Sequence, residues 1–112
     1  MKHTKEQVIE KAKKILTELN YDWYFENTIK IFNSENKEYY FEEYGGGEKW
    51  CFIANAPSEQ FANRNDAIIG LIINDDTLDP FIVFDTACGR SFDLKVSQKN
   101  GKYFIDGVWE GV

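Results

Sequence analysis

The sequence predicts an α+β fold, in which one N-terminal amphipathic helix packs on an antiparallel sheet of about five or six strands. Two observations carry this prediction. The first 20 residues repeat apolar side chains with the period of a helix, whereas the rest of the chain is divided into short runs of β-branched and aromatic residues. We expect a single domain spanning residues 1–112, because a chain of this length lies within the usual size range of one domain.

A capping box marks the start of the helix. Thr4 and Gln7 stand three residues apart, so the threonine hydroxyl can accept from the Gln7 amide while the glutamine side chain reaches back to the Thr4 amide. Asn20 is the predicted end of the helix. Between these points the apolar residues form one stripe: Val8, Ile9, Ala12, Ile15, Leu16 and Leu19.

The runs that read as strands lie at residues 28–32, 38–44, 49–54, 67–73, 81–85, 91–97 and 102–109. The first two are predicted to form a hairpin across the polar turn 33–36. Asn100-Gly101 predicts a type I′ turn between the last two, because both central residues of that turn need a positive φ. Residues 67–73 are apolar on both faces, which favours a central strand but leaves a short buried helix open as the alternative.

Charge is unevenly distributed along the chain, whose net charge is −6. Residues 1–14 carry a net charge of +3, whereas residues 18–85 hold fourteen acidic and four basic residues, a net charge of −10. A field of this sign repels the phosphates of nucleic acids and attracts a basic protein. Solubility alone is the simpler explanation of an acidic surface, so the charge by itself does not define a function.

No segment is expected to direct the chain to a membrane. The longest apolar stretch, residues 67–73, is far shorter than the ~20 residues that span a bilayer. Residues 1–5 lead directly into the helix without the apolar core of a signal peptide. We therefore expect a cytoplasmic protein, in which two unpaired thiols at Cys51 and Cys88 are favoured over the alternative of a disulfide between them.

Nucleophilic and acid–base chemistry finds little support in the residue pattern. His3 is the single histidine and precedes the helix cap, where we expect a solvated ring rather than a general base. Within residues 85–90, Cys88 near Arg90 could act as a nucleophile, but a β-turn between two strands is the favoured interpretation. We therefore expect no enzyme.

Metal and cofactor sites are not predicted either. Asp75, Asp76 and Asp79 could hold calcium, yet they lack the loop glycine and the terminal glutamate of an EF-hand loop. The two cysteines do not form a Cys-x-x-Cys pair, so a structural zinc site lacks its usual ligand spacing.

Three segments share a pattern with a known family. They are a leading helix at residues 6–12, a Trp-led strand (Lys49-Trp50-Cys51-Phe52-Ile53), and a Pro-led strand at residues 80–85 that runs to Gly89. In this layout the chain resembles small bacterial toxin-immunity proteins of the helix-plus-antiparallel-sheet kind. The resemblance implies a cytoplasmic antidote that binds a cognate toxin domain and blocks it. It implies no catalytic residues, and because toxin-contacting positions vary in such families, none is carried over.

The leading functional prediction is a non-enzymatic inhibitor that binds and neutralises a basic toxin domain, such as a nuclease. We expect the protein to bind neither nucleic acid nor membrane, and to be a monomer or a homodimer. Tyr and Trp are frequent anchors of binding interfaces, and acidic residues beside them accelerate docking to a basic partner. The predicted partner-binding residues combine the two types: Trp23, Tyr24, Tyr40, Glu42, Glu43, Glu48, Asp75, Asp76 and Asp79.

Two other readings stay open at the level of sequence. One is a small-molecule-binding or enzymatic α+β domain with a pocket between helix and sheet, in which Cys88 and Arg90 would be the reactive pair. The other is a subunit of a larger complex, or a homodimer, that assembles through an exposed strand edge.

Overall fold

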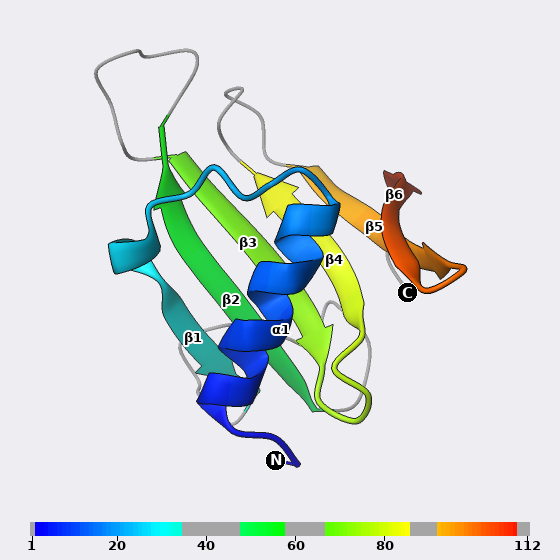
Figure 1. Ribbon diagram of the computed structural model, residues 1–112, viewed down its shortest axis with the longest axis horizontal. Helices are drawn as coiled ribbons and strands as arrows, with labels where there is room; N and C mark the ends of the chain where they lie inside the picture. Colours follow the sequence, from blue (N-terminus) through cyan, green and yellow to red (C-terminus); the bar gives the residue numbers. More distant parts are fainter. Residues whose placement is uncertain (1, 35–47, 58–66, 86–91, 110–112) are drawn as a thin grey trace.

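The computed structural model describes residues 2–34, 48–57, 67–85 and 92–109, and it has the predicted α+β fold. One helix lies across one face of a six-stranded antiparallel sheet (Figure 1). The strands follow one another across the sheet in the order β1-β2-β3-β4-β5-β6. The elements are α1 (Lys5–Glu18), the short 3-10 helix η1 (Glu26–Thr28), β1 (Lys30–Asn33), β2 (Lys49–Ala56), β3 (Ala67–Asn74), β4 (Pro80–Asp85), β5 (Phe92–Lys99) and β6 (Lys102–Val108).

The predicted capping box begins α1. The Gln7 amide donates to the Thr4 hydroxyl over 3.2 Å, and the Thr4 amide donates to the Gln7 side chain over 2.9 Å. The apolar stripe of α1 then faces the sheet, with Val8, Ala12 and Ile15 completely buried. The helix therefore starts and packs as its sequence predicts.

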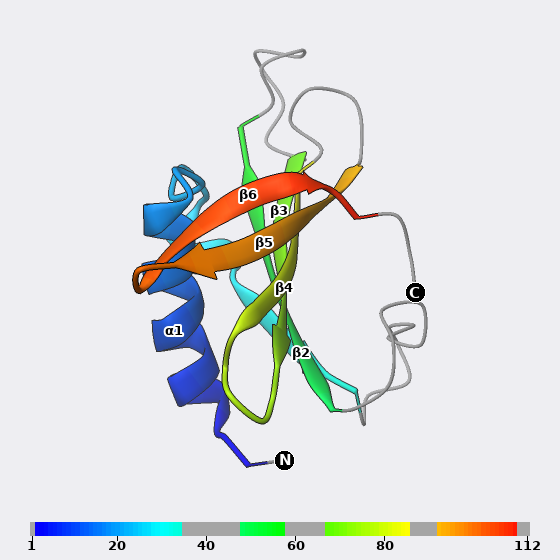
Figure 2. The same cartoon turned by 90° about the vertical axis from the view of Figure 1, so that its right-hand side faces the viewer.

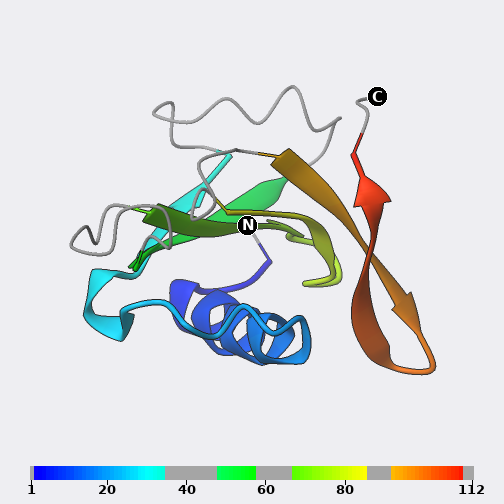
Figure 3. The same ribbon diagram turned by 90° about the horizontal axis from the view of Figure 1, so that it is seen from above.

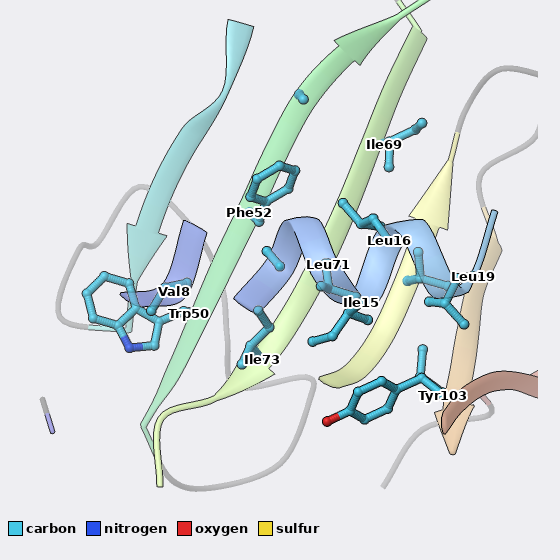
Figure 4. Close-up of a cluster of buried hydrophobic side chains, with 14 of the residues drawn as sticks. Val8, Ile15, Leu16, Leu19, Trp50, Phe52, Ile69, Leu71, Ile73 and Tyr103 are labelled. Carbon is cyan, nitrogen blue, oxygen red and sulfur yellow. The ribbon is translucent and has the colours of Figure 1, made fainter. Parts of the chain in front are cut away.

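The main core lies between α1 and the neighbouring strands β2 and β3 (Figure 4). Residues 67–73 belong to a strand, β3, which pairs with β2 on one side and β4 on the other, so the alternative of a short helix is wrong. Alternate residues of β2 and β3 point toward the helix and are nearly or completely buried: Trp50, Phe52 and Ala54, and Ile69, Leu71 and Ile73.

The face of the sheet opposite α1 carries a second buried cluster. Cys51, Ile72 and Ile82 are at most 2% exposed, and the partly buried Phe81 and Phe84 pack against them. Both faces of β3 are therefore covered by apolar side chains, which explains why its sequence lacks the alternation of a half-buried strand.

The β5–β6 hairpin turns out of the plane of the central strands, toward the side of the sheet that carries α1 (Figures 2 and 3). Its turn has the predicted type I′ conformation, with φ of +53° at Asn100 and +78° at Gly101. Tyr103, the second residue of β6, is buried against the helix side of the core. The bend therefore brings β6 next to α1, although five other strands separate it in the chain from the helix.

Strand boundaries differ from the prediction by a few residues. The run predicted at 28–32 begins as η1 and becomes a strand only at Lys30, and β2 continues to Ala56. The strand predicted at 38–44, and with it the hairpin across 33–36, lies outside the described residues. The described partner of β1 is β2.

Candidate functional site

The predicted partner-binding residues that the structure describes lie at two opposite ends of β2. Trp23 and Tyr24 belong to the connection after α1, which reaches the far end of β2 where the Phe25 amide donates to the Asn55 carbonyl over 2.7 Å. At the near end, the Asp75 amide donates to the Glu48 carbonyl over 3.0 Å. Seven residue steps of an extended strand separate these ends by about 23 Å.

The predicted residues therefore do not form one continuous acidic and aromatic surface in the described part of the chain. Tyr40, Glu42 and Glu43 lie outside the described residues. The two ends of β2 have to be considered separately.

At the near end, Asp75 is buried rather than exposed. Only 1% of the residue is accessible, and its carboxylate accepts two hydrogen bonds of 2.7 Å, from the Trp50 indole to Oδ1 and from the Lys2 amide to Oδ2. A carboxylate in this position cannot touch a partner, so Asp75 has to be removed from the predicted binding surface. Its role is to hold the N-terminal segment against the edge of the core.

The hydrogen bonds also determine the charge state of Asp75. Burial alone would raise the pKa of its carboxyl group, but donation from the Lys2 amide, the Trp50 indole and the His3 amide outweighs burial, and the pKa is lowered. Asp75 is therefore ionised at neutral pH, as a buried carboxylate with several donors should be.

His3 belongs to the same cluster, contrary to the expectation of a solvated ring. Its side chain is 24% exposed, and Nδ1 lies 3.6 Å from Oδ1 of Asp75. This nitrogen is buried and makes no hydrogen bond. The prediction of a solvated ring followed from the position of His3 near the chain terminus. The ring is instead packed against the buried carboxylate of Asp75, 72 positions away in the sequence.

The neighbouring acidic residues also have partners within the chain. Asp76 forms an exposed ion pair with the Lys2 ammonium group at 2.9 Å, and Asp79 accepts a hydrogen bond of 3.2 Å from the Tyr103 hydroxyl. Glu48 is exposed. Much of the negative charge at this end is therefore used to connect the N-terminal segment, the β3–β4 turn and β6.

The calcium alternative gains no support from this cluster. Within the described residues, no group of three or more His, Cys, Asp or Glu side chains is arranged to hold a metal ion. The Asp75 carboxylate faces N–H donors, which a cation would have to displace.

At the far end, a helix-terminating motif positions the predicted aromatic residues. Asn20 has a φ of +62°, the Asn20 amide donates to the Thr17 carbonyl, and the Tyr21 amide donates to the Leu16 carbonyl over 2.8 Å. These bonds define a Schellman motif, in which the left-handed residue reverses the chain direction. The predicted helix end at Asn20 is thus confirmed, and it determines where the next residues lie.

Tyr21, Trp23 and Tyr24 follow this motif, and we call them the aromatic corner. Trp23 is 37% exposed, its indole nitrogen donates to the Asn20 carbonyl over 3.1 Å, and its ring stacks on Tyr21 with 6.1 Å between ring centroids. Tyr24 is partly buried and meets Phe52 of the core edge to face. Burial raises the pKa of its hydroxyl group. The corner is therefore attached to the core on one side and presents Trp23 on the other.

The segment after the corner is fixed as well. The Asn55 amide donates to the Thr28 hydroxyl over 2.8 Å, and Lys13 of α1 forms an ion pair with Glu26. Asp22, between the two stacked rings in sequence, is exposed. Residues 20–28 are thus held at both ends, so the corner is ordered before any partner arrives.

Strand β6 carries exposed apolar residues that the sequence interpretation did not select. Phe104, Ile105 and Val108 are 40%, 38% and 55% exposed. Because side chains alternate along a strand, the buried Tyr103 implies that Phe104 faces outward, and the sequence could have revealed this. Ile105 and Val108 are exposed for another reason, which is that the sheet ends at β6 in the described residues.

The outer edge of β6 is nevertheless protected against strand pairing. The Tyr103 amide, which points away from β5, donates to the Glu18 carboxylate over 3.3 Å. Gly107, with a φ of +82°, lies where the pairing with β5 shifts register. A capped amide and a bulge are common devices that prevent edge-to-edge association, so β6 is a poor edge for assembly through added strands.

Between α1 and β2–β3, where the enzymatic alternative expects a pocket, the described side chains form a buried apolar core. Cys51 is 1% exposed, and burial raises its pKa to about 12, which makes its thiol unreactive. Cys88 and Arg90 lie outside the described residues. In the same described part, no helix has the length and apolar character required to cross a membrane.

Comparisons with protein-family models, with curated proteins and with solved structures gave no match.

Proposed function

We propose that the protein is a non-enzymatic inhibitor of the toxin-immunity kind, which binds and neutralises a cognate basic toxin domain in the cytoplasm. The observation that carries this proposal is the aromatic corner, where Trp23 is exposed yet held in one orientation by its bond to Asn20. Tryptophan and tyrosine are the residues most enriched at the energetic centres of protein interfaces.

Order at the corner supports binding because association loses conformational entropy at every side chain that must become fixed. Trp23 and Tyr21 are already stacked, and the segment that carries them is bonded to α1 and to β2. A partner that covers the indole therefore gains buried apolar area without ordering a flexible loop.

The charge of the chain supports a basic partner. A net charge of −6 on 112 residues gives an attractive long-range field for a cationic protein, and its main effect is on the association rate. The acidic residues at the near end of β2 contribute to this field even though Asp75, Asp76 and Asp79 have partners within the chain. Two features of the protein would therefore act at different steps. The aromatic corner anchors the complex, and the net negative charge raises the rate at which the complex forms.

The test is to co-express the chain with the product of the neighbouring open reading frame, which the proposal expects to contain a basic toxin domain, and to measure both cell survival and the dissociation constant of the purified pair. Trp23→Ala should weaken binding by about 30-fold or more, the usual threshold for a central interface residue. The matched control is Phe104→Ala, a side chain of almost equal exposure on β6, which should change binding less than about three-fold. Survival without any detectable complex, or equal effects of the two variants, would overturn the proposal.

A second variant tests the electrostatic part. Replacing Glu42, Glu43 and Glu48 together by Lys should slow association and flatten its dependence on salt, while the dissociation rate changes little. An association rate equal to that of the unmodified chain would show that these carboxylates do not steer the partner.

A further inference from the structure

Part of the Trp23 side chain is available to a ligand, and its surroundings limit what that ligand can be. Tyr21 stacks on the ring at an interplanar angle of 28°, and the indole nitrogen is occupied by the Asn20 carbonyl. The 37% of Trp23 that remains exposed therefore offers a flat π surface rather than a hydrogen-bond donor.

No cation of the described residues occupies this surface. The two cation–π contacts in the described part of the chain are Lys11 over Tyr103 and Lys49 over Phe81. Lys13 of α1, whose charge acts on Tyr24 of the corner, forms an ion pair with Glu26. The ring that is best exposed among the aromatic residues of the corner is thus left without a positive partner.

Negative charge is available on the residue that precedes Trp23 in the chain. Asp22 is exposed and forms no ion pair or hydrogen bond among the described residues, whereas Glu26 is already neutralised by Lys13. Asp22 also contributes to the electrostatic environment of Tyr24. A free carboxylate on the residue adjacent in sequence to an exposed aromatic side chain favours a cationic partner side chain over an apolar one.

We infer that the aromatic corner receives an arginine side chain of the partner, whose guanidinium group stacks on the open face of Trp23 beside the carboxylate of Asp22. Arginine fits better than lysine because a planar, weakly hydrated guanidinium stacks on an indole, whereas an ammonium group keeps its water. This inference rests on the proposed function, since it names the chemistry of the residue that the inhibitor would recognise.

The experiment uses short peptides as probes, so that it does not depend on the identity of the toxin. The ¹⁵N-labelled protein is titrated with the acetylated and amidated peptides Gly-Arg-Gly-Arg-Gly and Gly-Lys-Gly-Lys-Gly at constant ionic strength. The indole N–H resonance of Trp23, assigned by its loss in Trp23→Leu, should shift on titration with the arginine peptide. Half-saturation should need about three-fold less of the arginine peptide than of the lysine peptide.

Two internal controls make the result specific. The indole resonance of Trp50 should not move, because that indole is buried and bonded to Asp75. Asp22→Asn should weaken binding of the arginine peptide by about two- to three-fold, whereas Asp106→Asn, which removes an exposed carboxylate on β6, should leave its binding unchanged. Equal effects of the two peptides, or shifts centred on Glu48 and Asp76, would overturn the inference.

The outcome is distinguishable from failure of the proposed function. If the toxin domain binds with the expected loss in Trp23→Ala but the arginine peptide does not prefer the corner, the inference is wrong and the inhibitor function stands. If the arginine peptide binds as described but no basic toxin domain is neutralised, the arginine site stands and the inhibitor function is wrong.

Discussion

The indole nitrogen of Trp50 donates a hydrogen bond of 2.7 Å to Oδ1 of Asp75, and both residues are almost completely buried. The other carboxylate oxygen accepts from the Lys2 amide at the same distance. One buried anion thus joins the start of β2, the end of β3 and the N-terminal segment, three parts of the chain that are remote in sequence.

Replacing Asp75 should destabilise the fold more than any other acidic substitution at this end of β2. In Asp75→Asn the amide nitrogen would face the Lys2 or Trp50 donor, which leaves one buried donor without an acceptor and costs about 1–3 kcal/mol. The matched control Asp76→Asn removes only an exposed ion pair and should change the free energy of unfolding by less than about 0.5 kcal/mol. Urea unfolding followed by circular dichroism measures both, and equal effects would contradict the structural role of Asp75.

Stability should fall in acid partly because of the same carboxylate. The native pKa of Asp75 is lowered, whereas in the unfolded chain it returns to about 3.9. As the pH falls below that value, the unfolded state binds the proton first, so the stabilisation that is complete above about pH 5 is progressively lost. Urea midpoints measured at pH 6, 4 and 3 should decline less steeply in Asp75→Asn than in the unmodified chain. Parallel declines would indicate that other carboxylates dominate.

Gly70 should not tolerate a side chain while Phe84 covers it. A methyl group at Gly70 would overlap the end of the Phe84 ring, and relieving this contact should cost about 1–3 kcal/mol. In the background Phe84→Ala, the same Gly70→Ala substitution should cost clearly less, which a double-mutant cycle of unfolding free energies would measure.

The control for that cycle is Gly101→Ala, where a methyl group meets nothing within 4 Å but the φ of +78° is unfavourable. Its cost of about 1 kcal/mol comes from the backbone and should be the same with or without Phe84. If removing Phe84 relieved both substitutions equally, the steric explanation at Gly70 would fail.

Cys51 should be inert toward alkylating reagents in the folded protein. Its thiol is buried, and its pKa is raised to about 12, so almost no thiolate is present at pH 8. Iodoacetamide should therefore leave the variant Cys88→Ser unmodified in its native state and modify it once in urea, as counted by mass spectrometry. Rapid native labelling of that variant would show that the second buried cluster opens. Any native labelling of the unmodified chain then reports on Cys88 alone.

Local signals in the sequence predicted the regular elements well. The Thr4–Gln7 box, the helix end at Asn20 and the Asn100-Gly101 turn each depend on residues close together in the chain, and all three are present. The β-branched residues of 67–73 were interpreted correctly as a central strand because both faces of that strand are covered.

Long-range burial explains what the sequence did not predict. Residues 74–76 read as a polar turn, and only Lys2 and Trp50, which fold against it, make Asp75 an interior residue. Lys49 is similar: alternation places it on the same face as Cys51, where it is 4% exposed with its ammonium group over Phe81, and burial lowers its pKa. Neither contact leaves a trace in local composition.

The residues chosen for the candidate site from the sequence do not all lie together, again because contacts between distant parts of the chain decide where they lie. Trp23, which was selected because it stands beside an acid in sequence, is exposed, and the helix end determines its position. The prediction grouped Trp23 with Asp76 and Asp79, which lie at the opposite end of β2. The order of the strands, which separates them, cannot be predicted from the charge pattern.

Each described strand from β2 to β6 pairs with the described strand that precedes it in the sequence. No described strand has to enter the sheet between two strands that are already paired. The order of synthesis on the ribosome is therefore also an order in which the sheet can grow, one edge at a time, with mostly short-range closures that favour rapid folding. The exception is α1, which emerges first although its apolar stripe packs on β2 and β3. From the synthesis of residue 19 until β3 is complete at Asn74, the nascent chain carries an uncovered amphipathic helix, and this interval is when it most needs protection from aggregation.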